Sequence, residues 1–208
     1  MILDIHTHNK GANENSIINL SVEEYAEFNR PDRLYSIGLH PWHIGENTDK
    51  SIELLTKFAE NKNVVAIGET GIDSLNGNAP LFQQLLIMKR HIEISERVAK
   101  PLIIHNVKAH DIIISLRKEF SPSMPWIIHG FRNKPSVAKM LINAGCYLSF
   151  GMFFNEESLI STPDNRILAE TDDADIEIND VVCRLSDAYG KDIEQIILRN
   201  TAELFLQP

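Results

Sequence analysis

Five short apolar runs, spread over most of the chain, each end in residues that can bind a metal ion. They occupy residues 2–8, 64–69, 101–105, 126–129 and 167–172. Short runs this rich in Ile, Val and Leu are typical of strands buried in a parallel sheet. In a parallel barrel the carboxyl ends of all strands lie on one face, so side chains far apart in sequence are expected to meet there. The pattern predicts an α/β fold, a TIM-type (β/α) barrel with a metal centre at one end.

Strand-like and helix-like patterns alternate along the chain, as in a succession of βα units. We expect strands at residues 2–7, 16–20, 34–39, 64–68, 101–105, 126–129, 146–150 and 167–171. We expect helices at residues 22–29, 50–60, 80–99, 108–120, 135–144, 176–189 and 191–205. Only seven residues lie between His8 and Ser16, whereas a parallel crossover needs about a dozen or more. The first helix is therefore predicted to be missing, which leaves the barrel trimmed and irregular at its first unit.

The composition favours a single domain over residues 1–208. The length is below the ~250 residues typical of an eight-unit barrel, which fits one trimmed domain. No apolar run approaches the ~20 residues that span a bilayer, and Met1 leads straight into a strand-like segment. We therefore expect no membrane segment, no leader peptide and a cytoplasmic location. The net charge of −9 disfavours a broad basic surface, so no stable nucleic-acid partner is expected.

Four histidines and one glutamate at strand ends are the first candidate metal ligands. Positions i and i+2 of a strand face the same side, so His6 and His8 can reach one ion; the alternative is a surface pair or a satisfied core pair. Glu69 follows four apolar residues and a glycine, where a carboxylate is costly to bury unless it binds metal or pairs with an arginine. His105 and His129 close runs on successive strands, which favours ligands over core histidines.

The acids after the last strand supply the sixth candidate ligand. Asp172 ends the final apolar run and is predicted to bind metal, to accept a proton, or both. Glu170 and Asp173 compete for that role, and strand alternation places Glu170 on the same side as Asp172 but deeper. Asp73, expected in a turn beyond Glu69, is predicted to orient a ligand or to cap the loop.

Residues around these ligands are candidates for substrate binding. His40 and His43 follow another strand and are predicted to bind substrate or to orient a ligand; the alternative is a rigid turn packed under Trp42. Arg132 and Lys134 are further candidates for holding the scissile group. His91 and His110 lie in predicted outer helices and are expected to be solvated. No Ser-His-Asp or Cys-His order places a nucleophile, so a water-derived nucleophile is favoured.

Together these motifs resemble the TatD family of metal-dependent hydrolases, which belongs among the amidohydrolase-like TIM barrels. The resemblance rests on His6-x-His8, Gly38-Leu39-His40-Pro41, Ile67-Gly68-Glu69-Thr70-Gly71-Ile72-Asp73, Pro101-Leu102-Ile103-Ile104-His105, Ile128-His129-Gly130-Phe131 and Glu170-Thr171-Asp172. It implies a deoxyribonuclease-like phosphodiesterase with two divalent ions, Zn, Mn or Mg. It also implies that one ion is held by His6, His8 and Asp172. The other would be held by His105 and His129, with Glu69 bridging, so that Glu69 and Asp172 are the candidate catalytic residues.

The chain departs from the family pattern in its loops. Asn106-Val107-Lys108 follows His105 where the family has a small residue and Arg, and Asp173-Ala174 replaces Ala-Pro. The implied substrate is DNA or a small phosphodiester, but the altered loops leave two alternatives open. One is an amide, lactone or other ester hydrolase. The other is a binding protein that retains the barrel and has lost turnover.

Overall fold

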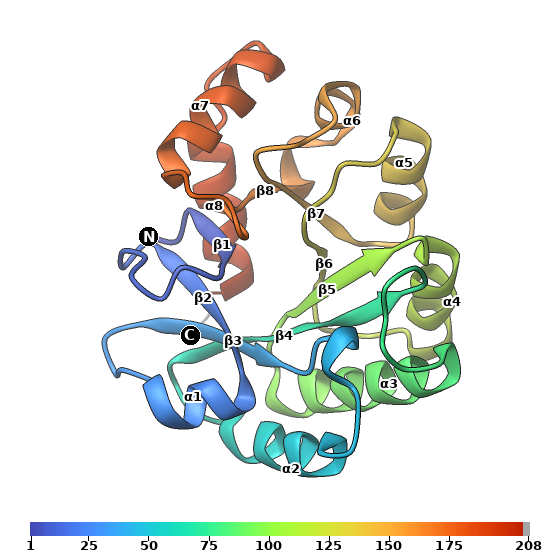
Figure 1. Cartoon of the computed structure of the whole chain (residues 1–208). Coiled ribbons are helices and arrows are strands. Elements are labelled where there is room, and N and C mark those ends of the chain that lie inside the picture. Colours follow the sequence, from blue (N-terminus) through green and yellow to red (C-terminus); the bar gives the residue numbers. More distant parts are fainter. Residues whose placement is uncertain (206–208) are drawn as a thin grey trace. The chain divides into compact units, whose positions relative to one another are not determined.

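The computed structural model describes residues 1–205, which form one parallel sheet whose eight strands follow one another in sequence order (Figure 1). The strands are β1 (Asp4–Thr7), β2 (Ser16–Ser21), β3 (Leu34–Gly38), β4 (Val64–Asp73), β5 (Leu102–Val107), β6 (Trp126–Ile128), β7 (Tyr147–Phe150) and β8 (Ile167–Ala169). A parallel bridge between Thr7 and Asp172 joins β1 to the segment after β8. This is the topology of a TIM-type (β/α) barrel, so the predicted fold class is confirmed.

Helices follow most of the strands. They are α1 (Val22–Phe28), α2 (Thr48–Phe58), α3 (Leu81–Val98), α4 (His110–Phe120), α5 (Pro135–Asn143), α6 (Glu156–Ser161), α7 (Ile178–Tyr189) and α8 (Glu194–Phe205), with short 3₁₀ helices η1 (Pro41–His43) and η2 (Asp164–Arg166). Residues 8–15 form turns rather than a helix, as predicted. The pattern did not predict α6, whose six residues are too few to display helical periodicity. Its start is set by Asn155, whose side chain accepts a hydrogen bond from the backbone N–H of Ser158.

Strand β4 is longer than predicted because it continues past Glu69 to Asp73. Gly71 has a φ of +150°, and a Cβ there would lie 2.0 Å from the carbonyl oxygen of His105. Only glycine therefore lets β4 approach β5 closely enough to keep pairing up to Asp73 and Val107. Asp73 thus ends a strand, and its predicted place in a turn is wrong.

Two compact units make up the chain, and the prediction of a single domain stays a prediction. The first consists of Met1–Ile18 and the described part of Ile127–Pro208, and the second of Asn19–Trp126. In the first unit, α8 forms hydrogen bonds near the first strand and with the last strand. The Asn200 side chain donates to the carbonyl of Ile167, and the Thr201 hydroxyl donates to that of Ile2. These bonds attach α8 to the first residue of β8 and to a residue just before β1.

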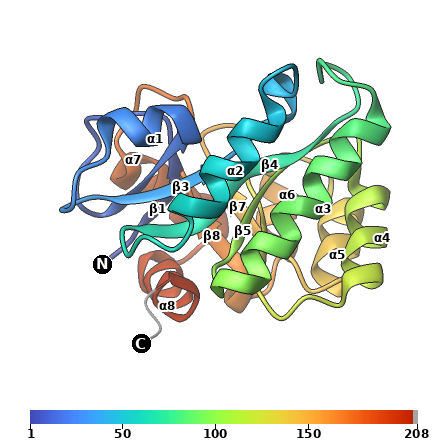
Figure 2. The same cartoon turned by 90° about the horizontal axis from the view of Figure 1, so that it is seen from below.

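In the second unit, α2, α3 and α4 lie side by side along the strands (Figure 2). The Arg97 guanidinium of α3 donates to the carbonyl of Thr56 in α2, and Lys89 pairs with Glu119 of α4 at 2.7 Å. None of the helices within residues 1–205 is both long and apolar enough to cross a bilayer.

The prediction that His91 is solvated is wrong, because α3 buries its ring completely. Nε2 accepts a hydrogen bond from the backbone N–H of Leu39 at 3.0 Å, and Nδ1 donates to the carbonyl of Ile87 at 2.8 Å. The bond to Nε2 requires the neutral ring, because a protonated Nε2 cannot accept. Burial lowers the pKa of His91 to about 4, since there is little water to solvate a charged imidazolium.

Acidification is therefore expected to destabilise the protein through His91. Its pKa is about 4 in the folded state and ~6.5 in an unfolded chain, so between these values the unfolded state binds more protons. Stability conferred by this residue is complete above pH 6.5 and is lost as the pH falls toward 4. From pH 7 to pH 5 the loss in free energy of unfolding is expected to be about 2 kcal/mol.

Urea unfolding of the wild type and of His91→Gln at both pH values measures this contribution. All other titrating groups are common to the two proteins, so the difference between their pH dependences isolates His91. The partly exposed His110, changed to Gln, is the matched control and should leave the wild-type pH dependence intact. An unchanged pH dependence in His91→Gln would contradict the prediction.

Candidate metal centre

In the first unit, His6, His8 and Asp172 offer three ligand atoms that lie within 4.8 Å of one another. Nε2 of His6 and Nε2 of His8 are each 3.6 Å from Oδ1 of Asp172. Two ligands of a tetrahedral ion, each at about 2.1 Å, would be about 3.4 Å apart. The spacing therefore matches what a single divalent ion requires.

Backbone pairing is what brings these three side chains together. The N–H of His8 donates to the carbonyl of Asp172 at 3.1 Å, and the N–H of Asp172 donates to the carbonyl of His6 at 2.9 Å. Asp172 has a φ of +55°, in the left-handed region, which aspartate tolerates better than most residues. Residues more than 160 positions apart in sequence thus share one short ladder.

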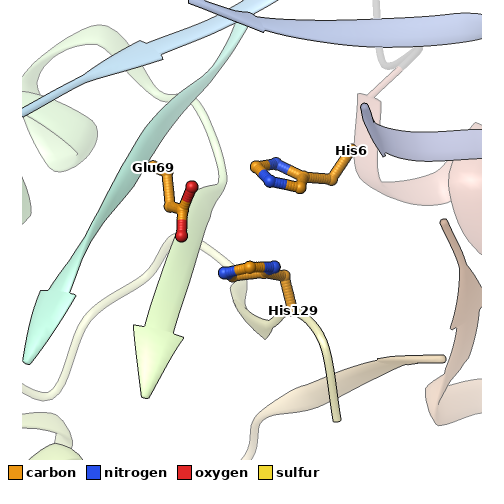
Figure 3. A group of neighbouring side chains, drawn as sticks. All are labelled: His6, Glu69 and His129. Atoms are coloured by element: carbon orange, nitrogen blue, oxygen red, sulfur yellow. The ribbon is translucent and has the colours of Figure 1, made fainter. Parts of the chain in front are cut away.

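A second group in the same unit consists of His129, Glu170 and Asp172. Nδ1 of His129 is 3.5 Å from Oε1 of Glu170, which also accepts from the N–H of Gly130. Figure 3 shows His129 facing the ring of His6, with the ring centroids 4.4 Å apart. Glu170 is fully buried while Asp172 is partly exposed, as strand alternation predicts.

The buried carboxylate of Glu170 indicates whether this cluster is suited to binding a cation. Among the described residues, its Oε2 atom is buried and accepts no hydrogen bond. A buried anionic oxygen without compensation is costly, and a divalent ion beside it would supply that compensation. The histidine and carboxylate donors are those that Zn²⁺ and Mn²⁺ accept in proteins. The residues present therefore fit a divalent metal ion.

Asp4 holds the backbone beside the cluster in place. It was not identified from the sequence as a candidate site residue. Its Oδ1 accepts from the backbone N–H groups of His6 and Thr171, and its Oδ2 accepts from the Thr171 hydroxyl at 2.7 Å. Burial raises the pKa of Asp4 to about 7, although the hydrogen bonds from Thr171 and His6 oppose the rise. The available signal was its position two residues before His6, on the same face of the strand.

The second unit gathers a separate group, His40, Glu69 and His105. Glu69, whose side chain projects from β4 in Figure 3, is buried. Its Oε1 lies 2.8 Å from Nδ1 of His105 and 3.2 Å from Nε2 of His40. Its backbone N–H donates to the side chain of Asn19 at 2.8 Å, which fixes the middle of β4. Burial lowers the pKa of His40, although Glu69 acts to raise it, so the ring favours the neutral form that binds metals.

Asp73 caps the loop after β4, which is one of its two predicted roles, and it also contacts His105. Its Oδ1 accepts from the backbone N–H groups of Leu75 and Asn76, and its Oδ2 accepts from the Trp42 indole at 2.7 Å. The same Oδ2 lies 3.3 Å from Nε2 of His105. Burial acts to raise the pKa of Asp73, but the hydrogen bonds from Asn76, Trp42, Leu75 and His105 outweigh it and hold the pKa at about 2. The carboxylate stays ionised and orients the His105 ring.

The candidate substrate-binding residues differ in where they lie. His40 belongs to the Glu69 group, and its Nδ1 accepts from the backbone N–H of Trp42, as in the rigid turn considered above. His43 is exposed at the end of η1. Arg132 is exposed and lines a cavity of about 270 Å³ in the first unit, which Asp172 also borders.

The same cavity contains residues that the sequence did not single out. They belong to the segment after β7, which leaves the strand at Gly151 and carries Met152, Phe153 and Phe154. Phe153 is 74% exposed although it is a large apolar side chain. Two adjacent phenylalanines in a loop beside a glycine were the signal available in the sequence.

Comparison with known proteins relates this arrangement to one family. The sequence pattern of the family described as TatD related DNase matches residues 6–205. A Buchnera aphidicola protein described as an uncharacterised metal-dependent hydrolase is 37% identical over 147 residues, 67% of this chain and 55% of that protein. YabD of Bacillus subtilis, described in the same words, is 31% identical over 160 residues, 73% of this chain and 60% of YabD. The chain therefore spans only a little over half the length of these two curated relatives.

Among solved structures, the chain is similar to YjjV, a TatD homologue from Escherichia coli K12. The TM-score is 0.85 with 22% sequence identity, and the match covers 100% of this chain and 98% of that one. At this identity the similarity demonstrates a shared fold, and it agrees with the predicted α/β barrel.

Proposed function

Because this chain belongs to the family of TatD related DNases, we propose that it is a metal-dependent hydrolase that cleaves phosphodiester bonds with a metal-activated water. The observation that supports this most directly is the His6, His8 and Asp172 cluster, whose donor spacing matches a single divalent ion. In this proposal those three residues hold one ion. His105 and His129 remain the predicted ligands of a second ion, and Glu69 its predicted bridge to the first.

The protein's own residues supply binding and proton transfer in this scheme. Bound divalent ions lower the pKa of a water toward ~7 and neutralise phosphate charge. Asp172 contacts both histidines through Oδ1, which leaves Oδ2 to hold the proton released by the attacking water. Its side chain is 33% exposed, so water and substrate reach it. Asp73 keeps the His105 ring in one orientation, and Glu170 adds negative charge beneath the cluster.

The proposed metal is Zn, Mn or Mg. Histidine with carboxylate suits Zn and Mn, whereas Mg favours oxygen ligands and retains waters. The proposed substrate is DNA or a small phosphodiester, bound only during turnover because the net charge of −9 repels a polyanion in the absence of metal. A cytoplasmic location stays a prediction.

A metal-titrated activity screen tests the proposal. The metal-free protein is supplied separately with Mn²⁺, Zn²⁺ and Mg²⁺ and assayed against single-stranded DNA, simple phosphodiesters, amides and lactones. Phosphodiester cleavage that needs metal supports the proposal. Cleavage of amides or lactones alone would instead establish the other kind of hydrolase. Cleavage of nothing in the panel, together with no metal bound, would favour a binding protein.

A further inference from the structure

We propose that Trp42 is a positioning residue for His105 and that it acts through the carboxylate of Asp73. This rests on the proposed function, in which His105 binds a metal ion, and it identifies a residue that sets how tightly that ion is held. The three residues come from three elements of the second unit, which are η1, the end of β4, and β5.

The carboxylate of Asp73 has two neighbours on each oxygen. Oδ1 accepts from the backbone N–H groups of Leu75 and Asn76 at 2.9 and 2.8 Å, so the loop after β4 fixes that oxygen. Oδ2 accepts from the indole N–H of Trp42 at 2.7 Å and lies 3.3 Å from Nε2 of His105. The indole bond is the shorter of the two contacts on Oδ2. Without it, Oδ2 would be free to turn away from His105.

Trp42 is itself fixed by contacts of its backbone. Its N–H donates to Nδ1 of His40 at 3.1 Å, and its carbonyl accepts a hydrogen bond from the side chain of Asn78. Pro41, the residue before it, restricts the backbone where η1 begins. The indole therefore gives up little conformational freedom when it binds Asp73.

The Trp42 ring also covers the two imidazoles of the second unit's ligand group. It lies edge-on to His40 and to His105, with ring centroids 4.8 and 5.9 Å apart. The side chains of His40 and His105 are each 13% exposed, whereas Trp42 is 44% exposed. A ring in this place keeps water from the contact between Asp73 and His105, and a drier contact is electrostatically stronger.

The orientation of His105 matters because an imidazole binds a metal ion only along the lone pair of its nitrogen. Removing a group that orients such a ring typically weakens metal binding about 10- to 100-fold. Trp42 acts one contact further away, through Asp73, so we expect an effect at the lower end of this range. The cluster of His6, His8 and Asp172 lies in the first unit, and its ion should keep its affinity.

Titration of the metal-free protein with Zn²⁺ tests the proposal. Trp42→Phe keeps an aromatic ring but removes the indole N–H, so it is expected to raise the Kd of one ion about 10-fold and to leave the other unchanged. A substitution that only disturbed the fold would weaken both ions. In Asp73→Asn, the amide nitrogen that replaces Oδ2 cannot accept from the indole. Trp42→Phe should therefore have no further effect in that background.

Magnetic resonance signals of the indole N–H groups provide a readout that needs neither metal nor substrate. The chain has two tryptophans, so Trp126→Phe assigns both signals. Trp126 is also the matched control, because its ring is fully buried and its Nε1 has no hydrogen-bond partner within residues 1–205. Asp73→Asn should shift the Trp42 signal and leave the Trp126 signal in place. Trp126→Phe should keep both Kd values, and thermal melting checks that each variant is folded.

The possible outcomes separate this role from the proposed function. Equal Zn²⁺ affinities in the wild type and Trp42→Phe would overturn the positioning role and leave the hydrolase standing. Selective weakening of one ion by Trp42→Phe, in a protein that cleaves no phosphodiester, would support the role and overturn the phosphodiesterase. An unshifted Trp42 signal in Asp73→Asn would overturn the role whatever is cleaved. A wild type that binds no Zn²⁺ would overturn both.

Discussion

Asp172→Asn is expected to lower kcat at least about 1,000-fold at saturating metal, the range typical of a lost general base. The amide has the same shape as the carboxylate, so it preserves the backbone ladder with His6 and His8. It removes the negative charge that faces both imidazoles at 3.6 Å, and it cannot accept the proton from the attacking water. Initial rates across a metal titration measure the effect and separate weak metal binding from slow chemistry.

Asp173→Asn is the matched control for this variant. Asp173 is the next residue, is exposed and borders the same cavity, so its replacement makes an equal change in charge. We expect its kcat to stay within about 3-fold of the wild type, because an exposed charge acts on the site through a screened interaction. Wild-type rates in Asp172→Asn would remove Asp172 from the chemistry.

Metal removal is the second prediction with a large expected effect. Chelation should reduce hydrolysis to background, and Mn²⁺ or Zn²⁺ should restore it. His129, Glu170 and Asp172 place three ligand atoms within 4.8 Å of one another, so two carboxylates lie close together and a bound cation would offset their repulsion. An ion at about 100 times its Kd should raise the free energy of unfolding by about 2.7 kcal/mol. Thermal or urea unfolding with and without metal measures this gain.

Two variants identify which residues are needed for the stabilisation by metal. His6→Ala should lose most of the stabilisation by metal, because it removes a fully buried ligand of the proposed first ion. His110→Ala should keep all of it, since His110 belongs to none of the candidate ligand groups found in residues 1–205. A protein that binds no metal and is not stabilised by Mn²⁺ or Zn²⁺ would instead be a barrel without turnover.

Several features of the fold could be predicted because their causes are local. Alternating apolar and helical patterns located the eight strands and seven of the eight helices in residues 1–205, within a few residues at each end. The seven residues after His8 are too few for a crossover helix, and residues 8–15 form turns. Errors occurred where a contact from elsewhere overrides the local pattern. β4 runs on to Asp73 because Gly71 lets β5 approach, and His91 is buried because a backbone N–H 52 positions away supplies its partner.

The sequence by itself determined the fold class and the positions of the metal-capable residues. Strand alternation and the common direction of parallel strands are enough to place His6, His8 and Asp172 at strand ends. Only the tertiary structure decided how those residues are held, through the ladder between His6 and Asp172 and the Asp4–Thr171 bonds across 167 positions. It also decided which loop side chains border the cavity. Such contacts join segments that carry no local signal of one another, because the first strand and the segment after the last strand become neighbours only when the chain folds.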